Sequence, residues 1–187
     1  MPSFLKSGDQ IEIIAPARFV DKEDIIYAEE IIKKNGFKVK IRDTLFKRKD
    51  IFAGTKKDRI LNLESSLNDS QTKAIFFARG GYGCIQIIDS INFNKFLECP
   101  KWLIGFSDIT TILVHIYTQY KIYSIHGPMA YNLKQINQKS IDMTFDLLRG
   151  RREQIKLSTH DLNVYGNCSG ILIGGNLSIL CSMIGSS

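Results

Sequence analysis

Residues 101–120 read KWLIGFSDITTILVHIYTQY and contain a complete strand-to-helix unit. The apolar run at 101–106 predicts a buried strand, and residues 108–120 repeat apolar side chains at helical spacing. Ser107 stands at the corner between the two. Because parallel strands need crossover connections, most often helices, this unit indicates a parallel sheet.

The same alternation continues along the rest of the chain. Gly36 is expected to follow the end of the first helix, and Thr55 with Asp58 resembles a capping box that opens the second. This pattern predicts an α/β fold, with a mostly parallel, Rossmann-like sheet that carries helices on both faces and is followed by the start of a second domain. Strands are predicted over 10–17, 38–42, 74–78 and 122–125, and helices within 21–37, 55–67, 84–90 and 140–148.

The composition changes after residue 149. Residues 150–170 are polar and lack an apolar period, which predicts a linker. Residues 171–187 then begin a new strand, a Gly-Gly-Asn turn and an apolar helix. We therefore expect a first domain over 1–149, which contains Ser107, and an incomplete C-terminal domain over 171–187, as in a truncated chain.

The composition also argues against several classes of protein. With 187 residues, 44% of them hydrophobic, the chain can bury a core, and no apolar run approaches the ~20 residues of a membrane helix. The N-terminus lacks the zones of a secretory signal, which predicts a cytoplasmic protein without a membrane partner. The net charge of +6 comes from scattered clusters without a nucleic-acid-binding motif, which favours solvated surface charge over nucleic-acid binding.

The cysteines and histidines do not follow a metal-binding pattern. No Cys-x-x-Cys pair occurs, so we expect reduced cysteines and neither a bound metal nor another cofactor. Residues of both types are scattered along the chain: Cys84, Cys99, Cys168, Cys181, His115, His126 and His160.

Four of the predicted strands end in segments rich in Gly, Pro, Ser or His. These segments are APAR (15–18), ARGGYG (78–83), GFSD (105–108) and HGPM (126–129). In parallel sheets ligands bind at the carboxyl ends of the strands. The four segments are therefore expected to share one rim and one site.

Ser107 has two interpretations. A serine at a strand-to-helix turn has free backbone N–H groups and the positive end of the helix dipole beside it, as a nucleophile needs. GFSD resembles a nucleophile elbow, although Asp108 and Ile109 follow where the Gly-x-Ser-x-Gly pattern has its last glycine. Serine is also a favoured N-cap, and this stretch alone favours the cap.

The glycine segment and the histidines also have more than one interpretation. Adjacent glycines let a backbone approach a ligand, but ARGGYG matches neither a dinucleotide fingerprint nor a Walker loop, so a plain turn is as well supported. His126 either acts on a substrate or only bonds to a neighbouring loop. His115 lies two turns beyond Ser107 on the same helix and His160 lies in the linker, so neither is favoured as a general base.

Taken together, these stretches resemble the LD-carboxypeptidase family of serine peptidases, which includes murein tetrapeptide carboxypeptidases and microcin C self-immunity proteins. They occur in the family's order and cover essentially the whole chain. The matching stretches are GDQIEIIAPA (8–17), FAGTKKDRILNLESSLNDSQTKAIFFARGGYG (52–83), IGFSDITTIL (104–113), HGPM (126–129) and GILIGGNLSIL (170–180).

The resemblance implies a role for each candidate residue. Ser107 becomes the nucleophile, and the backbone N–H groups of Gly81 and Asp108 form the oxyanion hole. The side chains that line the substrate cleft are Arg79, Tyr82 and His126. The family's general base, a histidine oriented by a glutamate, has no counterpart here, so this chain by itself is expected to be inactive.

The implied reaction is hydrolysis of a peptide bond between an L- and a D-configured centre. It releases terminal D-alanine from a cytoplasmic murein tetrapeptide in peptidoglycan recycling, or it inactivates a peptide-like antibiotic. The implied partners are a small peptide or muropeptide and a second copy of the chain in a homodimer. The alternatives are a non-catalytic domain that binds muropeptides on the same rim and, ranked last, a nucleotide-binding domain that uses RGGYG.

Overall fold

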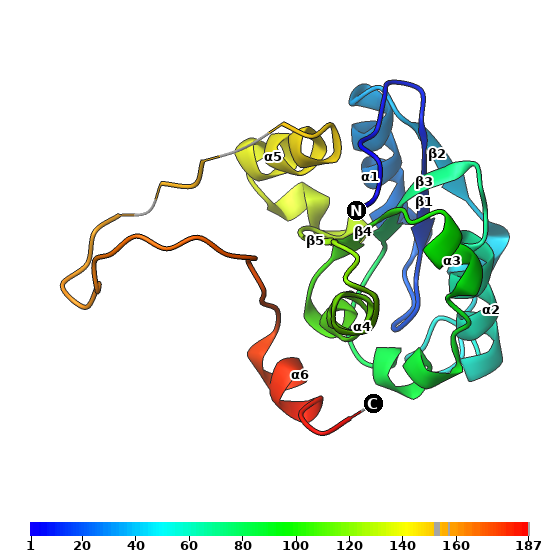
Figure 1. The fold of residues 1–187 in the computed structure, drawn as a ribbon. Helices are drawn as coiled ribbons and strands as arrows, with labels where there is room; N and C mark the ends of the chain where they lie inside the picture. The colour runs from blue at the N-terminus through cyan, green and yellow to red at the C-terminus, as the bar shows by residue number, and fades with distance from the viewer. Residues whose placement is uncertain (152–153, 157, 187) are drawn as a thin grey trace.

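Five parallel strands form the centre of the molecule (Figure 1). The computed structural model describes residues 1–151, 154–156 and 158–186. The strands pair in the order β2-β1-β3-β4-β5, so the direction of winding reverses between β1 and β3. The strands are β1 (Gln10–Ile14), β2 (Lys38–Ile41), β3 (Thr72–Phe77), β4 (Trp102–Gly105) and β5 (Ile125–His126).

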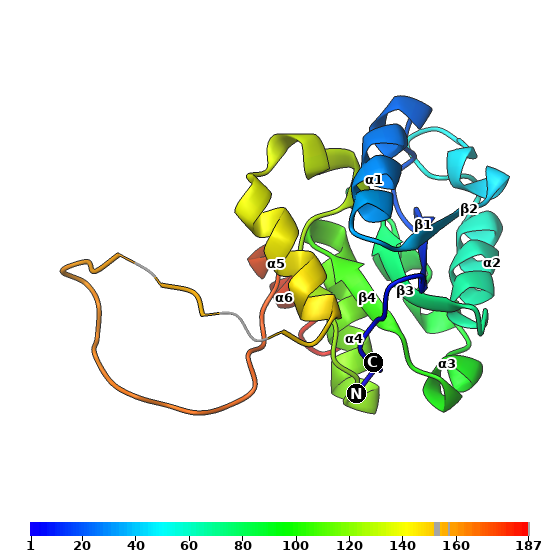
Figure 2. The same cartoon turned by 90° about the horizontal axis from the view of Figure 1, so that it is seen from above.

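Helices cover both faces of this sheet, which confirms the predicted α/β fold (Figure 2). One face carries α1 (Lys22–Lys34) and α5 (Gln138–Leu148), and the other carries α2 (Lys56–Leu67), α3 (Asn94–Glu98) and α4 (Thr110–Tyr120). Among the described residues, no helix has the length and apolar character needed to cross a membrane. The 3₁₀ turns are η1 (Asp43–Phe46), η2 (Cys84–Gln86), η3 (Ile88–Ser90), η4 (Ser107–Ile109) and η5 (Ala130–Gln135).

Two hydrophobic cores follow from the alternation of side chains along the strands. Ile13 and Phe76 belong to the core under α1 and α5, whereas Ile75 and Phe77 belong to the core under α2 and α4. All four side chains are fully buried. Burial on both faces explains why β3 reads as a continuous apolar run instead of an alternating one.

The C-terminus of α1 and the N-terminus of α2 have the capping residues that the sequence predicts. α1 ends at Lys34, and Gly36 follows with φ +81°, a left-handed conformation that glycine adopts without a Cβ clash. Before α2, Thr55 Oγ1 accepts a hydrogen bond from the Asp58 N–H (3.1 Å). The Asp58 carboxylate in turn accepts one from the Thr55 N–H (2.9 Å), so the capping box is confirmed.

Two predicted elements before residue 149 differ from the structure. Residues 84–90 form two 3₁₀ turns instead of a helix, because backbone N–H groups donate to carbonyls three residues earlier, as from Ile87 to Cys84 (3.1 Å). The strand predicted at 122–125 is reduced to β5 at the edge of the sheet. Lys121 adopts a left-handed conformation (φ +55°) at the end of α4 and redirects the chain before it rejoins the sheet.

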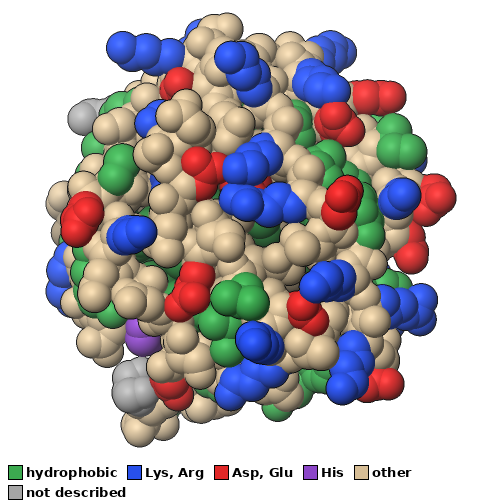
Figure 3. Space-filling view, turned by 90° about the vertical axis from the view of Figure 1, so that its right-hand side faces the viewer, with side chains coloured by type: hydrophobic (Ala, Val, Ile, Leu, Met, Phe, Trp, Pro, Cys, Tyr) green, Lys and Arg blue, Asp and Glu red, His purple; other side chains and the backbone are tan. Residues whose placement is uncertain are grey.

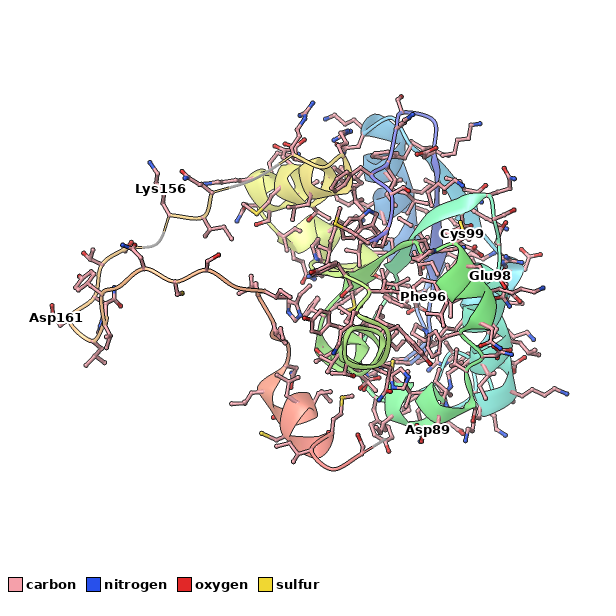
Figure 4. The ribbon with its side chains drawn as sticks, viewed as in Figure 1. Asp89, Phe96, Glu98, Cys99, Lys156 and Asp161 are labelled. Carbon is pink, nitrogen blue, oxygen red and sulfur yellow. The ribbon has the colours of Figure 1, made fainter. Side chains whose placement is uncertain are left out.

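The described residues between 151 and 170 contain no helix or strand. They project away from the sheet, where Lys156 and Asp161 mark them in Figure 4. Their role as a linker between two domains stays a prediction. Arg152, Glu153 and Leu157 of this predicted linker, and Ser187 of the predicted C-terminal domain, lie outside the described residues.

The strand predicted after residue 170 does not form. Leu172 is 98% exposed, and no described strand lies beside it to complete a hydrogen-bonded ladder. The predicted helix does form as α6 (Leu177–Ser182). The Asn176 N–H before it donates to Thr110 Oγ1 at the start of α4 (3.1 Å), which connects the start of α6 to α4.

Surface charge is mixed in sign. Figure 3 shows Lys and Arg side chains interspersed with Asp and Glu on the face that carries α2 and β2. Lys47 forms an ion pair with Asp58 (2.6 Å), and Lys40 pairs with Asp69. Positive charge on this face is therefore compensated locally instead of gathered into one basic patch.

Thr55→Ala should lower the free energy of unfolding by about 1 kcal/mol, because the first turn of α2 loses its side-chain acceptor. Urea unfolding measures this change. Ser65→Ala is the matched control, since Ser65 is exposed within the same helix and alanine favours a helix. Equal losses in the two variants would contradict a specific contribution from the capping box.

Candidate active site

The carboxyl ends of β1, β3, β4 and β5 meet at one edge of the sheet, because all the strands are parallel. The segments that follow these strands are also bonded to one another, so the four predicted segments form one rim. Three backbone hydrogen bonds join them: from the Arg18 N–H to Gly80 O (3.2 Å), from the Tyr131 N–H to Ala78 O (3.0 Å) and from the Gly127 N–H to Gly105 O (3.2 Å).

Ser107 lies at the β4–α4 corner in an unusual backbone conformation. Its φ is +60°, which few residues other than glycine adopt, and its side chain is half-buried. Phe106, not Ser107, occupies the N-cap position of η4. Within the described part of the chain, Ser107 Oγ accepts no hydrogen bond from a backbone N–H of η4 or α4 that would cap them. The helix-cap interpretation is therefore wrong, and the strain matches that of a nucleophile elbow.

The glycine loop after β3 packs directly on this corner. A Cβ added to Gly80 would lie 3.1 Å from Ser107 Cβ and 3.3 Å from the Asp108 backbone nitrogen. Gly81 and Gly83 have φ values of +108° and +142°, which side chains rarely adopt. Close approach at Gly80 and backbone conformation at the other two explain why this loop is built from glycine.

Asp108 links the corner to the glycine loop through its side chain. The residue is 1% exposed, and its Oδ2 accepts a hydrogen bond from the Cys84 N–H (2.9 Å). Among the described residues, its Oδ1 has no hydrogen-bond partner. Burial raises the pKa of Asp108, and the Cys84 bonds and the Arg59 charge oppose that rise. Asp108 therefore contributes a buried acceptor in addition to the backbone N–H that the family resemblance assigns to it.

Arg59 on α2 belongs to the rim but is absent from the predicted site. It is 2% exposed and donates hydrogen bonds to Gly83 O (2.8 Å) and to Gln86 Oε1 (2.7 Å). A signal for it exists in the sequence, because Arg59 shares the buried face of α2 with Leu63 and Leu67, four and eight residues later. A charged residue at such a position needs internal partners.

The predicted cleft residues are Arg79, Tyr82 and His126. Among the described residues, none of them is hydrogen-bonded to Ser107. The Arg79 guanidinium lies 5.3 Å from the centre of the Tyr131 ring, and Tyr82 is 52% exposed. His126 is exposed and pairs across the sheet with Gly105, two residues before Ser107. Partial burial of its ring lowers the pKa of His126.

The other two histidines lie elsewhere. His115 packs its ring against Phe93 (5.5 Å between centroids) and Tyr120 (6.0 Å). Burial lowers the pKa of His115. His160 is exposed on the segment that projects from the sheet. Neither histidine is hydrogen-bonded to Ser107 among the described residues.

A serine with positive φ at a strand-to-helix corner, with a glycine loop packed against it at the rim of an α/β sheet, resembles the nucleophile elbow of α/β-hydrolases. The chain belongs to the LD-carboxypeptidase family: residues 11–127 match the family described as the LD-carboxypeptidase N-terminal domain. The matched range runs from the second residue of β1 to the residue after β5, so it contains all of the sheet except Gln10.

Relatives and solved structures agree with this assignment. A probable murein peptide carboxypeptidase of Bacillus subtilis (strain 168) is 29% identical over 195 residues, which cover 99% of this chain and 60% of the relative. A crystal structure of a muramoyltetrapeptide carboxypeptidase from Oxalobacter formigenes has a TM-score of 0.85 at 24% identity, covering 95% of this chain and 60% of that one. The microcin C7 self immunity protein without ligand has a TM-score of 0.82 at 20% identity, covering 99% of this chain and 65% of that one. Both structural likenesses show a shared fold.

The chain spans about 60% of the length of the first curated relatives that it matches. The sheet and its rim lie inside the shared part.

Ser107→Gly should unfold with a free energy about 1 kcal/mol larger than that of Ser107→Ala, because glycine adopts a positive φ without the steric cost of a Cβ. Both variants lack the hydroxyl, so the comparison isolates the backbone. The same pair of substitutions at Ser65, within α2, should favour alanine. If glycine is no more stable than alanine at residue 107, the corner is not strained.

Asp108→Asn should gain stability relative to the unmodified chain as the pH rises from about 4. The pKa of Asp108 is raised in the folded state. The contribution of Asp108 to the free energy of unfolding is therefore complete below the ordinary aspartate pKa, and it is lost as the pH rises through the folded-state pKa. Asparagine does not titrate. Urea unfolding across this pH range measures the difference, with the exposed Asp161→Asn as control. A difference that stays constant with pH would contradict the raised pKa.

Proposed function

We propose that this chain carries the nucleophile of a serine carboxypeptidase that cleaves the bond between an L- and a D-configured residue of a cytoplasmic murein tetrapeptide. The released product is terminal D-alanine. The observation that carries the proposal is the strained Ser107 corner with Gly80 packed against it. Membership of the LD-carboxypeptidase family and the name of the Bacillus subtilis relative support the choice of substrate.

The geometry suits acyl transfer. Ser107 Oγ attacks the carbonyl carbon of the scissile bond, and the carbonyl oxygen becomes an oxyanion. Backbone N–H groups of Gly81 and Asp108 donate hydrogen bonds to this oxyanion, aided by the positive end of the η4–α4 dipole. The amine of D-alanine leaves with a proton, and water then hydrolyses the acyl-enzyme.

We assign substrate binding to Arg79, Tyr82 and His126. In the described ion pairs Arg79 has no carboxylate partner, so its guanidinium is available to a substrate carboxylate. Tyr82 offers an exposed ring beside Phe52 (6.4 Å between centroids) for packing against a peptide. A carboxypeptidase must bind the free carboxylate of its substrate, and one arginine on the rim meets that need.

Proton transfer needs a general base beyond these residues. Since no described histidine is bonded to Ser107, we expect the 187 residues by themselves to have little or no turnover. The family resemblance assigns the base to a second domain, so the division into 1–149, 150–170 and 171–187 forms part of this proposal. A homodimer is likewise part of it.

A second candidate function rests on the same observation. If no base acts on Ser107, as among the described residues, the rim can still hold a muropeptide or small peptide as a non-catalytic binding domain. A peptide-like antibiotic is the other substrate class, supported by the fold shared with the microcin C7 self immunity protein.

The deciding experiment incubates the chain with a murein tetrapeptide, with and without free imidazole as an external base, and follows D-alanine by mass spectrometry. We expect release that depends on imidazole and is lost in Ser107→Ala. Ser182→Ala, on the exposed helix α6, is the control that should retain release. A tetrapeptide ending in L-alanine should stay intact.

Each contrary outcome has one meaning. Equal release by Ser107→Ala would contradict Ser107 as the nucleophile. Tetrapeptide binding that survives in Ser107→Ala, without release under any condition, would favour the binding domain.

A further inference from the structure

The peptide group between Gly83 and Cys84 lies between two buried charged side chains. Its carbonyl oxygen accepts a hydrogen bond from Arg59 Nη1 (2.8 Å), and its N–H donates to Asp108 Oδ2 (2.9 Å). The negative end of the peptide dipole thus faces the cation, and the positive end faces the carboxylate. No ion pair among the described residues joins Arg59 to Asp108 directly, so this peptide connects them.

Arg59 also fastens two other parts of the rim. Nη1 donates to Pro16 O after β1 (3.3 Å), and Nη2 donates to Gln86 Oε1 in η2 (2.7 Å). The guanidinium lies 4.6 Å from the centre of the Phe52 ring. One side chain of α2 therefore holds the loops that follow β1 and β3, and the loop after β4 joins them through Asp108.

Glycine at position 83 allows this close contact. A Cβ there would lie 2.5 Å from Arg59 Nη1, and the φ of +142° is one that side chains rarely adopt. Rotation of the Gly83–Cys84 peptide would break the bonds to Arg59 and Asp108 together. Since each broken bond would remove a hydrogen-bond partner from a buried charged group, the alternative orientation is disfavoured.

We propose that Arg59 is a positioning residue, which holds the Gly83–Cys84 peptide and, through it, keeps the glycine loop and Asp108 in the arrangement that points backbone N–H groups at the oxyanion. Arg59 itself does not touch the substrate. The catalytic part of this inference rests on the proposed function, whereas the structural part can be tested without any turnover.

The structural test is amide hydrogen exchange of the ¹⁵N-labelled chain, measured by NMR at Gly81, Gly83 and Cys84. Arg59→Met should speed exchange of the Cys84 amide at least about tenfold, because removal of a buried charged partner frees the peptide. Arg59→Lys keeps the charge but has one nitrogen in place of Nη1 and Nη2, which bind Gly83 O and Gln86 Oε1 separately, so it should give an intermediate increase. This second variant decides the question if Arg59→Met does not fold.

Lys101→Met is the matched control. Lys101 is also a buried cation (3% exposed), and its Nζ donates to two backbone carbonyls, Ser66 O (3.0 Å) and Asp69 O (2.6 Å). It precedes β4 and therefore lies at the opposite edge of the sheet. Unchanged exchange of the glycine loop in Arg59→Lys and Arg59→Met, or an equal increase in Lys101→Met, would overturn the proposal.

A pH titration supplies a readout that simple loss of packing would not move. The Cys84 amide chemical shift reports ionisation of Asp108, to which it is bonded. The titratable and charged groups that act on Asp108 are the Cys84 thiol from η2 and Arg59 from α2. Loss of the Arg59 charge should move the midpoint of this titration to higher pH, and Lys101→Met should leave it unchanged.

Activity completes the test and separates the two proposals. In the imidazole-dependent assay, Arg59→Met should lower kcat severalfold with little change in KM, because the oxyanion contacts belong to the transition state. Absence of turnover in every variant contradicts the proposed function and leaves the exchange result to decide the role of Arg59. Turnover that is unaffected by Arg59→Met overturns the positioning role.

Discussion

The common direction of the strands is the constraint on which the site depends. Because β1, β3, β4 and β5 all run the same way, their carboxyl ends open on one edge, and segments far apart in the chain become neighbours there. The Arg18–Gly80 and Tyr131–Ala78 hydrogen bonds exist only because of this arrangement. An antiparallel strand in the same place would carry its loop to the opposite edge.

The rim contains several features that reduce stability, and the two cores supply the stability that they need. Ser107 has a strained backbone, Asp108 is a buried acid whose Oδ1 has no hydrogen-bond partner among the described residues, and Arg59 is a buried cation. These residues cluster within one corner of the molecule. Fully buried aromatic and branched side chains cover both faces of the sheet behind them. Such clustering of unfavourable groups is characteristic of functional sites.

The buried charges at the rim compensate one another through the backbone instead of through a direct ion pair. The Gly83–Cys84 peptide is hydrogen-bonded to both Arg59 and Asp108. The position of the glycine loop and the burial of these two charges therefore depend on each other. Direct pairing would stabilise both charges but would leave the loop free. Contact through the peptide connects the glycine loop both to α2 and to the β4–α4 corner.

The sequence by itself determined the element types, the parallel α/β class and the four rim segments, because these depend on short-range patterns: the run of apolar residues in β3, the Thr55–Asp58 box and Gly36. The family motifs also singled out Ser107. Short-range patterns gave wrong predictions for 84–90 and for the strand at 122–125, where contacts with Asp108 and the αL residue Lys121 override local preference. They also predicted a strand after residue 170, which does not form because no described strand lies beside it.

Only the tertiary structure decided that Ser107 is a strained corner residue and not a helix cap, since its positive φ and the close packing of Gly80 against it are properties of the folded chain. It also decided the role of Arg59, whose partners Pro16 and Gly83 lie 43 and 24 residues away in the chain. Neither contact has a local signature. A buried charge takes whatever partners the fold brings within hydrogen-bond distance, and that distance is set in space and not along the sequence.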